Sequence, residues 1–417
     1  MQKTYRIRLG ELSLDASVRL KDVGYFILFL LFITPYSLSV GGQGVSANYS
    51  FVLLPLFMVL ITGRFNKLSL GNSFVLSCFA LIFIIASLYQ IVYIDYFVRR
   101  LLSFIIFFSM FTYMFIKIDS GMVGAFKLAV ISYALYSSLA SEISYFILGG
   151  TELADYAKGL VGSQRIGFIY LIAFWIIFLY EKKGGMAALL KSMFIFILLG
   201  GLLLTFSRTS IIGFVGSLLI FFAFKVGKGL VDGRFLISTI YKVFIGVAFI
   251  IVVLLGLTYF LPQTFTFFEG RIFNYTSTSE NILVDLNDAH SSLGYRWFML
   301  KQVWGYILAN PVTGSGYLGV WVLFDDSSGS AHSQYLDVLF RTGFIGFIIY
   351  CYLIYKVSKF LFKNDSGLFW GFIGILIYSL FHETFKLSSG GFVLAFLLGM
   401  LCQAETLYPR LYNRRAS

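Results

Sequence analysis

The stretch IFILLGGLLLTFSRTSIIGFVGSLLIFFAF, residues 195–224, decides the fold class of this chain. It contains two long apolar runs that are separated by the short polar sequence Ser207-Arg208-Thr209. An apolar run of about 20 residues is what an α-helix needs to cross the ~30 Å hydrocarbon core of a bilayer. The two runs therefore predict two membrane-spanning helices joined by a tight turn that carries Arg208.

Similar apolar runs recur along the whole chain, whose 417 residues are 59% hydrophobic and only 12% charged. This composition excludes a large soluble catalytic domain. We expect an all-α, polytopic membrane protein with about twelve spans, or eleven if the nearly contiguous seventh and eighth runs form one. The expected spans are residues 24–41, 51–63, 72–92, 101–116, 121–148, 166–181, 189–206, 209–224, 244–261, 342–355, 367–384 and 391–404.

The distribution of positive charge predicts the orientation, because Lys and Arg near span ends favour the cytoplasmic side. With this span order, 21 of the 32 Lys and Arg share the side of both termini, and ten lie on the other side. Residues 1–23 and 405–417 are therefore expected in the cytoplasm, without a cleaved signal peptide. The whole chain, 1–417, is expected to form a single membrane domain.

The longest polar stretch, residues 262–341, falls on the opposite, outward side and is the one loop large enough to fold. Within it, five apolar residues recur at three- and four-residue spacing, which predicts an amphipathic helix on the membrane or over a cavity. These residues are Trp297, Leu300, Trp304, Ile307 and Leu308. The loop carries four basic and seven acidic residues, so specific arginines must matter there, not a broadly positive field.

The sequence lacks the motifs that several classes of protein require. There is no Walker loop, no His-Glu-x-x-His pair, no Cys/His metal spacing and no basic block typical of nucleic-acid binding. The glycines of Gly314-Ser315-Gly316 are expected to form a plain turn. Asp325 and Asp326 suit a solvated loop tip, with metal binding as the alternative.

Arginines on the outward side are the most informative candidates, because a guanidinium near the bilayer is costly unless it pairs with a carboxylate or phosphate. Arg208 lies at a turn back into the membrane, Arg296 opens the amphipathic helix, and Arg165 ends the third outer loop. Arg99 and Arg100 head the fourth span. For each of these arginines, anchoring at the membrane interface is the alternative to a functional role.

His332 is the most interesting of the three histidines, all of which fall on the outward side. It precedes the tenth span, where Asp337 can pair with Arg341 at i,i+4 spacing. A histidine titrates near neutral pH and can accept a proton from a hydroxyl, so general base and structural cap are both open. His290 is expected to be solvated, and His382-Glu383 is a second polar contact or simple packing.

Three motifs, in this order, resemble the O-antigen ligase/polymerase superfamily of bacterial envelope biosynthesis. They are LLTFSRTS, LGYRWFMLKQVWGYILANPVTGSGYLG and AHSQYLDVLFRTGFIG, and the resemblance covers roughly residues 195–350. Their signature residues are Ser207-Arg208-Thr209, Arg296-Trp297, Asn310-Pro311 with Gly314 and Gly316, and His332-Ser333 with Tyr335-Leu336. Ser333 stands where Asn is commoner in the family.

The resemblance implies a GT-C type glycosyltransferase in the bacterial inner membrane that acts on undecaprenyl-diphosphate-linked oligosaccharide at the periplasmic face. Arg208 and Arg296 are then expected to stabilise the departing diphosphate and His332 to act as general base. Arg165, Arg99, Arg100 and Tyr335 are expected to bind substrate. The reaction should invert the anomeric carbon without a metal or other cofactor, since arginines replace the cation.

Two reactions remain open within this family. A Wzy-type O-antigen or capsule polymerase, the favoured reading, extends a lipid-linked repeat unit, whereas a WaaL-type ligase transfers the polymer to lipid A-core. Membrane lipids, a chain-length regulator and a flippase are the candidate partners. A flippase or ion-coupled transporter is the alternative of another class, for which Glu142 and Lys127 are the candidate mid-membrane groups.

Overall fold

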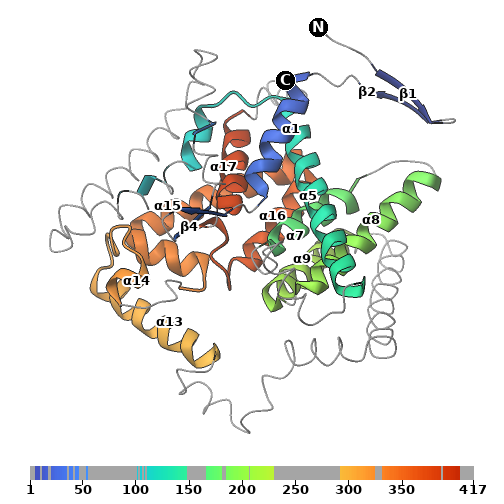
Figure 1. Cartoon of the computed structure of the whole chain (residues 1–417). Helices are drawn as coiled ribbons and strands as arrows, with labels where there is room; N and C mark the ends of the chain where they lie inside the picture. The colour runs from blue at the N-terminus through green and yellow to red at the C-terminus, as the bar shows by residue number, and fades with distance from the viewer. Residues whose placement is uncertain are drawn as a thin grey trace.

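The computed structural model describes the chain over residues 5–9, 12–16, 20–34, 37–40, 43–46, 53–54, 101, 104–105, 108, 110–147, 166–180, 185–205, 207–229, 292–324, 331–386 and 388–403. These residues are the described part of the chain. Their architecture is helical, as predicted (Figure 1).

The helices follow the apolar runs of the sequence. They are α1 (Leu20–Ile33), η3 (Tyr113–Phe115), α5 (Ser120–Ile147), α7 (Gly167–Phe178), α8 (Gly185–Leu204), α9 (Arg208–Gly229), α13 (Ser292–Ala309), α14 (Val320–Leu323), α15 (Gln334–Asn364), α16 (Ser366–Tyr378), η4 (Thr384–Lys386) and α17 (Ser388–Cys402). Two small antiparallel hairpins accompany them. One pairs β1 (Tyr5–Leu9) with β2 (Leu12–Ala16), and the other pairs β3 (Ser37–Val40) with β4 (Gln43–Ser46).

Four of these helices are long and apolar enough to cross a membrane, over Ser120–Ile143, Gly185–Leu204, Arg208–Gly227 and Gln334–Asn364. Shorter apolar helices cover Gly167–Phe178, Ser366–Tyr378 and Ser389–Cys402. The chain is therefore a helical membrane protein. The expected spans at 72–92 and 244–261, and nearly all of 51–63, lie outside the described residues, so the number twelve stays a prediction.

Two span boundaries differ from the sequence-based expectation. The first helix ends at Ile33 and not at 41, because Thr34 precedes Pro35 and the residue before a proline disfavours helical angles. The tenth predicted span begins at Gln334 and not at 342, but it is broken at Gly343, where the backbone leaves the helical region (φ 64°, ψ −173°). The apolar run after 342 thus corresponds to the second part of a kinked helix.

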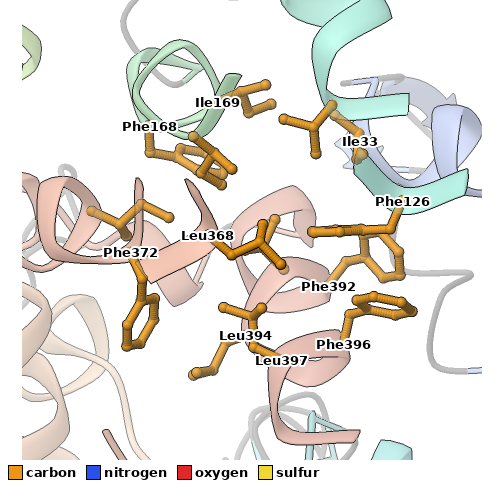
Figure 2. Packing of buried hydrophobic residues seen from close by; sticks show 14 of the residues in the cluster. Ile33, Phe126, Phe168, Ile169, Leu368, Phe372, Phe392, Leu394, Phe396 and Leu397 are labelled. Carbon is orange, nitrogen blue, oxygen red and sulfur yellow. The ribbon is translucent and has the colours of Figure 1, made fainter. Parts of the chain in front are cut away.

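Aromatic side chains fill the core where α1, α5 and α17 meet (Figure 2). The rings of Phe126 and Phe396 stack with centroids 4.4 Å apart, and Phe29 meets Phe392 at 5.4 Å and Phe396 at 5.2 Å. Aromatic pairs of this geometry add stabilisation beyond the burial of their area. They hold the first described helix against the last one.

Glycines let α16 approach α7 and α9 closely, as small residues do between membrane helices. A Cβ on Gly371 would lie 2.9 Å from the Cα of Ile172, and one on Gly213 would lie 3.1 Å from the carbonyl oxygen of Gly374. Trp175 of α7 donates a hydrogen bond from Nε1 to Ser217 Oγ of α9, at 3.0 Å. These three helices therefore form one tightly packed unit.

The expected amphipathic helix is α13, and it packs against the first part of α15. Its buried side chains are Met299, Val303 and Ile307. Of the five apolar residues that predicted this helix, only Ile307 is buried, and the others are 39–60% exposed. The helix therefore has two apolar faces. One face packs on the protein, and the other, which includes Trp297 and Trp304, is turned away from it.

Candidate active site

The two ends of the helix bundle can be told apart by ion pairs. Lys127, in the second turn of α5, pairs with Asp365, between α15 and α16. Lys21 at the start of α1 pairs with Asp119, just before α5, at 2.5 Å. The N-termini of α1 and α5 and the C-terminus of α15 therefore share one end, which we call the lysine end.

The opposite end of the bundle, which we call the site end, gathers three helix ends, two of which carry sequence motifs. These are the start of α9, the start of α15 and the end of α16. A Cβ added to Gly167 would collide with Ser210 Oγ and lie 3.2 Å from the ring of Tyr378. The start of α7, directly after Arg165 in the chain, thus packs beside the same two helices.

Arg208 lies at this end as the first residue of α9, and its side chain is half-buried. The turn before it is built from side-chain hydrogen bonds, since the backbone N–H of Ser207 donates to Thr205 Oγ1 at 3.3 Å. Ser207 Oγ in turn accepts from the backbone N–H of Ser210 at 3.3 Å. A serine in this position caps the free N–H groups at a helix start. The predicted tight turn at Ser207-Arg208 is confirmed.

His332 lies in the short segment that leads into α15, and its backbone is left-handed (φ 53°). Such a conformation is strained for a residue with a Cβ and persists only when the surroundings fix it. Ser333 caps α15 by accepting from the backbone N–H of Leu336. The side chain of His332 is half-buried at the start of this helix.

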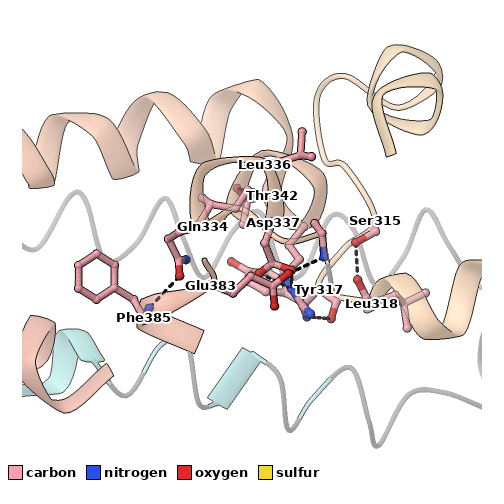
Figure 3. Close-up of polar contacts among 12 residues, drawn as sticks. Ser315, Tyr317, Leu318, Gln334, Leu336, Asp337, Thr342, Glu383 and Phe385 are labelled. Carbon is pink, nitrogen blue, oxygen red and sulfur yellow. Dashed lines mark hydrogen bonds and ion pairs between the residues drawn. The ribbon is translucent and has the colours of Figure 1, made fainter. Parts of the chain in front are cut away.

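Three hydrogen bonds connect this segment to the chain that follows α16. The backbone N–H of Ala331 donates to Glu383 Oε1 at 2.6 Å, and the backbone N–H of Gln334 donates to the carbonyl oxygen of Ser379 at 2.9 Å. Gln334 Oε1 accepts from the backbone N–H of Phe385 at 2.8 Å (Figure 3). His332 is thus fixed by bonds on both of its flanks.

The helix starts that carry Arg208 and His332 both pack against the end of α16. Ser210, two residues after Arg208, lies beside Gly167 and Tyr378, while Gln334, two residues after His332, bonds to Ser379. The structure therefore brings two of the predicted catalytic residues to one end of the bundle.

Glu383 is a buried carboxylate that the sequence did not assign to the site, with 7% of its surface exposed. Its neighbour His382 contacts the ring of Tyr378 with centroids 5.0 Å apart. The available signal was a His-Glu pair at the end of an apolar run, which the sequence could not distinguish from packing. Only the contact with Ala331 places Glu383 next to the His332 segment.

The glycine-containing turn after α13, residues 311–317, packs against the break in α15 at Gly343. At this break, the carbonyl oxygens of Phe340 and Arg341 accept from the backbone N–H groups of Ser315 (2.7 Å) and Tyr317 (3.0 Å). A Cβ on Gly343 would collide with the carbonyl of Val312, so this glycine is needed for the close approach as well as for its positive φ.

This turn is structural, as the sequence predicted. The backbone N–H groups of Gly314, Ser315, Gly316 and Tyr317 all donate to carbonyl oxygens of the protein. They are therefore engaged inside the fold and not arranged to cradle a phosphate.

A buried ion pair reinforces the same junction (Figure 3). Arg341 Nε lies 2.9 Å from both carboxylate oxygens of Asp337, and its Nη1 donates to the carbonyl oxygen of Tyr317 at 3.1 Å. The predicted i,i+4 pairing is confirmed. Burial raises the pKa of the Tyr317 hydroxyl well above its ordinary value. The two family-like motifs are thus joined into one rigid unit.

The other predicted site residues are less defined. Arg296 belongs to α13, of which only the backbone is described at that position. Tyr335 donates its hydroxyl to the carbonyl oxygen of Leu376 at 3.0 Å, which engages it within the bundle. Arg165, Arg99 and Arg100 lie outside the described residues, as do Asp325, Asp326 and His290.

Fold and site together define a helical membrane protein whose polar, half-buried residues collect at one end of the bundle. Residues 193–351 match the family model described as O-antigen ligase. The resemblance to the O-antigen ligase/polymerase superfamily is therefore confirmed, over almost the same stretch that carries the motifs. None of the curated proteins compared with the chain matches it.

The matched family indicates a membrane enzyme of glycosyltransferase type whose substrates are lipid-linked polysaccharides. It supports a role in lipopolysaccharide biosynthesis without separating polymerase from ligase.

Proposed function

We propose that this chain is a polymerase of O-antigen or capsular polysaccharide with a GT-C type fold. It transfers a nascent glycan from undecaprenyl diphosphate onto a lipid-linked repeat unit. The observation that carries the proposal is that Arg208 and His332, both within the matched residues 193–351, lie at the starts of two helices that pack at the end of α16.

In this mechanism His332 accepts the proton of the acceptor hydroxyl. The hydroxyl oxygen then attacks the anomeric carbon of the donor, and the bond from that carbon to the diphosphate oxygen breaks. The diphosphate leaves with the bonding electrons, and attack from the opposite face inverts the anomeric configuration. A base in hydrogen-bond reach of the hydroxyl is what such a step requires.

Arginine suits the diphosphate because its planar fork binds phosphate oxygens in pairs and keeps its charge at any working pH. Arg208 is held at the first turn of α9, where the positive end of the helix dipole adds to its charge. Arg296 shares the role from α13 and Arg165 assists, in place of a divalent metal.

The lysines at the lysine end indicate how the bundle is oriented in the membrane. Lysines at the ends of spans favour the cytoplasmic side, and Lys21, Lys127, Lys225 and Lys356 all lie at that end or in the half of a helix that leads to it. We therefore place the lysine end in the cytoplasm and the site end at the periplasmic face of the inner membrane.

A ligase that uses lipid A-core as acceptor needs the same donor chemistry and is the second candidate. A transporter is less well supported, because Lys127, one of its two candidate mid-membrane groups, pairs with Asp365 at the lysine end.

The gel pattern of lipopolysaccharide or capsule from a deletion strain tests the proposal. A polymerase defect leaves a single repeat unit on the core and removes the ladder. Polymer that accumulates on undecaprenyl diphosphate would replace the proposal by a ligase, and untransferred units trapped inside the cell would replace it by a flippase.

A further inference from the structure

The C-terminal part of α15 carries a ladder of tyrosine and lysine side chains on its outer face. The ladder consists of Tyr352, Tyr355, Lys356, Lys359 and Lys363, all exposed and spaced by one, three or four residues. The opposite face of the same turns, with Leu353, Val357, Phe360 and Leu361, is buried in the bundle. The helix therefore presents its apolar side to the protein and its cationic side to the surroundings.

The ladder is organised by contacts between its own members. Lys356 Nζ lies 5.2 Å from the ring centroid of Tyr352, and Lys359 Nζ lies 5.5 Å from that of Tyr355. Lys359 Nζ also donates to the hydroxyl of Tyr355 at 3.3 Å. Cation–π contacts of this kind hold the ammonium groups close to the helix, beside the phenol hydroxyls.

The positive charge of this ladder is not balanced by acidic neighbours in the described part of α15. Between Asp337, which pairs with Arg341, and the end of the helix there is no Asp or Glu. Asp365, which follows the helix, is bound to Lys127 and accepts from the backbone N–H of Leu368 at 3.1 Å. Within the described part of α15, the three lysines thus form a cationic surface that suits an anionic partner.

The position of the lysines along α15 indicates the kind of anionic partner. The two parts of α15 together hold 31 residues and rise about 45 Å, more than the ~30 Å thickness of a bilayer core, so the last turns of the helix reach the headgroup region. Lys356, Lys359 and Lys363 occupy its last turns at the lysine end. Tyrosine and lysine side chains are favoured at the membrane interface, where the acyl chains meet the headgroups.

We propose that this ladder, Tyr352 to Lys363, is a binding surface for the phosphate groups of anionic phospholipids at the lysine end of the bundle. Lysines bind the phosphates as point charges, and the rings of Tyr352 and Tyr355 hold the ammonium groups of Lys356 and Lys359 close to the helix. This inference rests on the geometry of α15 and does not depend on the reaction at the site end.

The test uses the full chain purified in detergent and titrated with phosphatidylglycerol or, separately, phosphatidylcholine, with bound lipid counted by native mass spectrometry. We expect wild type to prefer phosphatidylglycerol. Replacing the three lysines by glutamine (K356Q/K359Q/K363Q) should weaken phosphatidylglycerol binding about five-fold per lysine and leave phosphatidylcholine binding unchanged.

Two variants serve as matched controls. K301Q removes a lysine that also lies over an aromatic ring, Trp297 at 5.2 Å, but outside the ladder, and should keep the preference. The triple arginine variant K356R/K359R/K363R retains the charge and should keep it as well. An unchanged preference in the triple glutamine variant, or an equal loss in K301Q, would overturn the proposal.

A second measurement needs no variant and decides the matter if the triple glutamine protein does not fold. Raising ammonium acetate from about 0.05 to about 0.5 M shortens the range of charge–charge attraction several-fold. Wild-type binding of phosphatidylglycerol should fall over this range while that of phosphatidylcholine stays constant. Binding of both lipids that is insensitive to salt would contradict a cationic surface.

Discussion

The Lys21–Asp119 pair at the lysine end and the Asp337–Arg341 pair at the site end differ in how far their charges are exposed. The side chains of Lys21 and Asp119 are 43% and 39% exposed although they pair with each other. The side chains of Asp337 and Arg341 are 4% and 10% exposed. Exposed charges need only water and neighbours of roughly the right sign, whereas buried ones need partners at defined positions. The geometry of the Asp337–Arg341 pair is therefore specified more closely than that of the Lys21–Asp119 pair.

The strongest test of this contrast is the loss of arginine at the site end. We predict that Arg208→Ala and Arg296→Ala abolish transfer while normal amounts of protein reach the membrane, because the diphosphate charge is left unstabilised. Arg→Lys should fail nearly as badly, since an ammonium group cannot reproduce the planar fork. We would measure transfer activity with lipid-linked substrate and the amount of each variant protein in the membrane.

Lys225 of α9 provides the matched control for Arg208 on the same helix. It lies near the lysine end, with Nζ 5.7 Å from the ring centroid of Phe221. Lys225→Ala should leave transfer unchanged. Near-normal product from Arg208→Lys or Arg296→Lys would remove that arginine from the diphosphate role.

The next largest effect is expected at His332. Removing a general base typically costs about 10²- to 10⁴-fold in rate, so His332→Ala should lower polymer synthesis by that order with little change in donor binding. His332→Gln keeps hydrogen bonding but not basicity, and should lose the ascending limb of the pH–rate profile. The assay uses lipid-linked substrate over a range of pH.

His290→Ala is the control for general damage to the outward side, and we expect it to be almost silent. A His332→Gln protein that retained most of its rate, with a flat acid limb, would show that His332 only caps the helix or orients Tyr335.

The buried pair at the α15 kink should dominate stability rather than chemistry. Arg341→Ala or Asp337→Ala leaves an uncompensated buried charge and should destabilise the protein by about 3–5 kcal/mol. Replacing both residues by apolar ones, as in D337L/R341M, should cost clearly less. Thermal unfolding in detergent compares the three proteins, and equal losses in all of them would contradict the assignment.

The ion pair at the lysine end should have a much smaller effect. Burial acts to raise the pKa of Asp119, but hydrogen bonds from Lys21 and from the backbone of Met122 outweigh it and lower the pKa overall. A lowered folded-state pKa gives stability that is present above the unfolded value of about 3.9 and is lost as pH falls through the folded value.

Because both side chains are partly exposed, Lys21→Gln should change the free energy of unfolding by less than about 1 kcal/mol at neutral pH. Unfolding at neutral and acid pH measures it. A loss as large as that of Arg341→Ala would erase the distinction between the two ends.

The smallest expected effect is that of chelation. We predict that EDTA leaves the activity of the purified protein unchanged, because the arginines carry the role of a cation. Activity that fell with EDTA and returned with Mg²⁺ or Mn²⁺ would contradict this and direct attention to Asp325 and Asp326.

Much of this organisation was available from local sequence. Apolar runs predicted helices because a membrane-spanning backbone must satisfy its hydrogen bonds within one segment. The i,i+4 spacing of Asp337 and Arg341 predicted their pair, and Ser207-Arg208 predicted a turn, because both depend on residues that are neighbours along the chain. The glycines of the turn after α13 were likewise recognised as structural.

Contacts between distant segments could not be predicted in the same way. Nothing in the sequence shows that Glu383 accepts from Ala331, about fifty residues earlier, or that the turn at Ser315 fills the break at Gly343. The apolar residues of α13 predicted a helix but not which face is buried, because Met299 and Val303 form a second apolar face. That choice is made by the surface of α15.

The sequence by itself determined the helical membrane class, the turn at Arg208 and the family-like motifs, since each depends on the composition or spacing of a continuous stretch. Only the tertiary structure decided that the helix starts carrying Arg208 and His332 both pack at the end of α16, and that His332 is held in a left-handed conformation. The physical reason is that helix packing and long-range hydrogen bonds depend on how whole helices fit together, which no local pattern encodes.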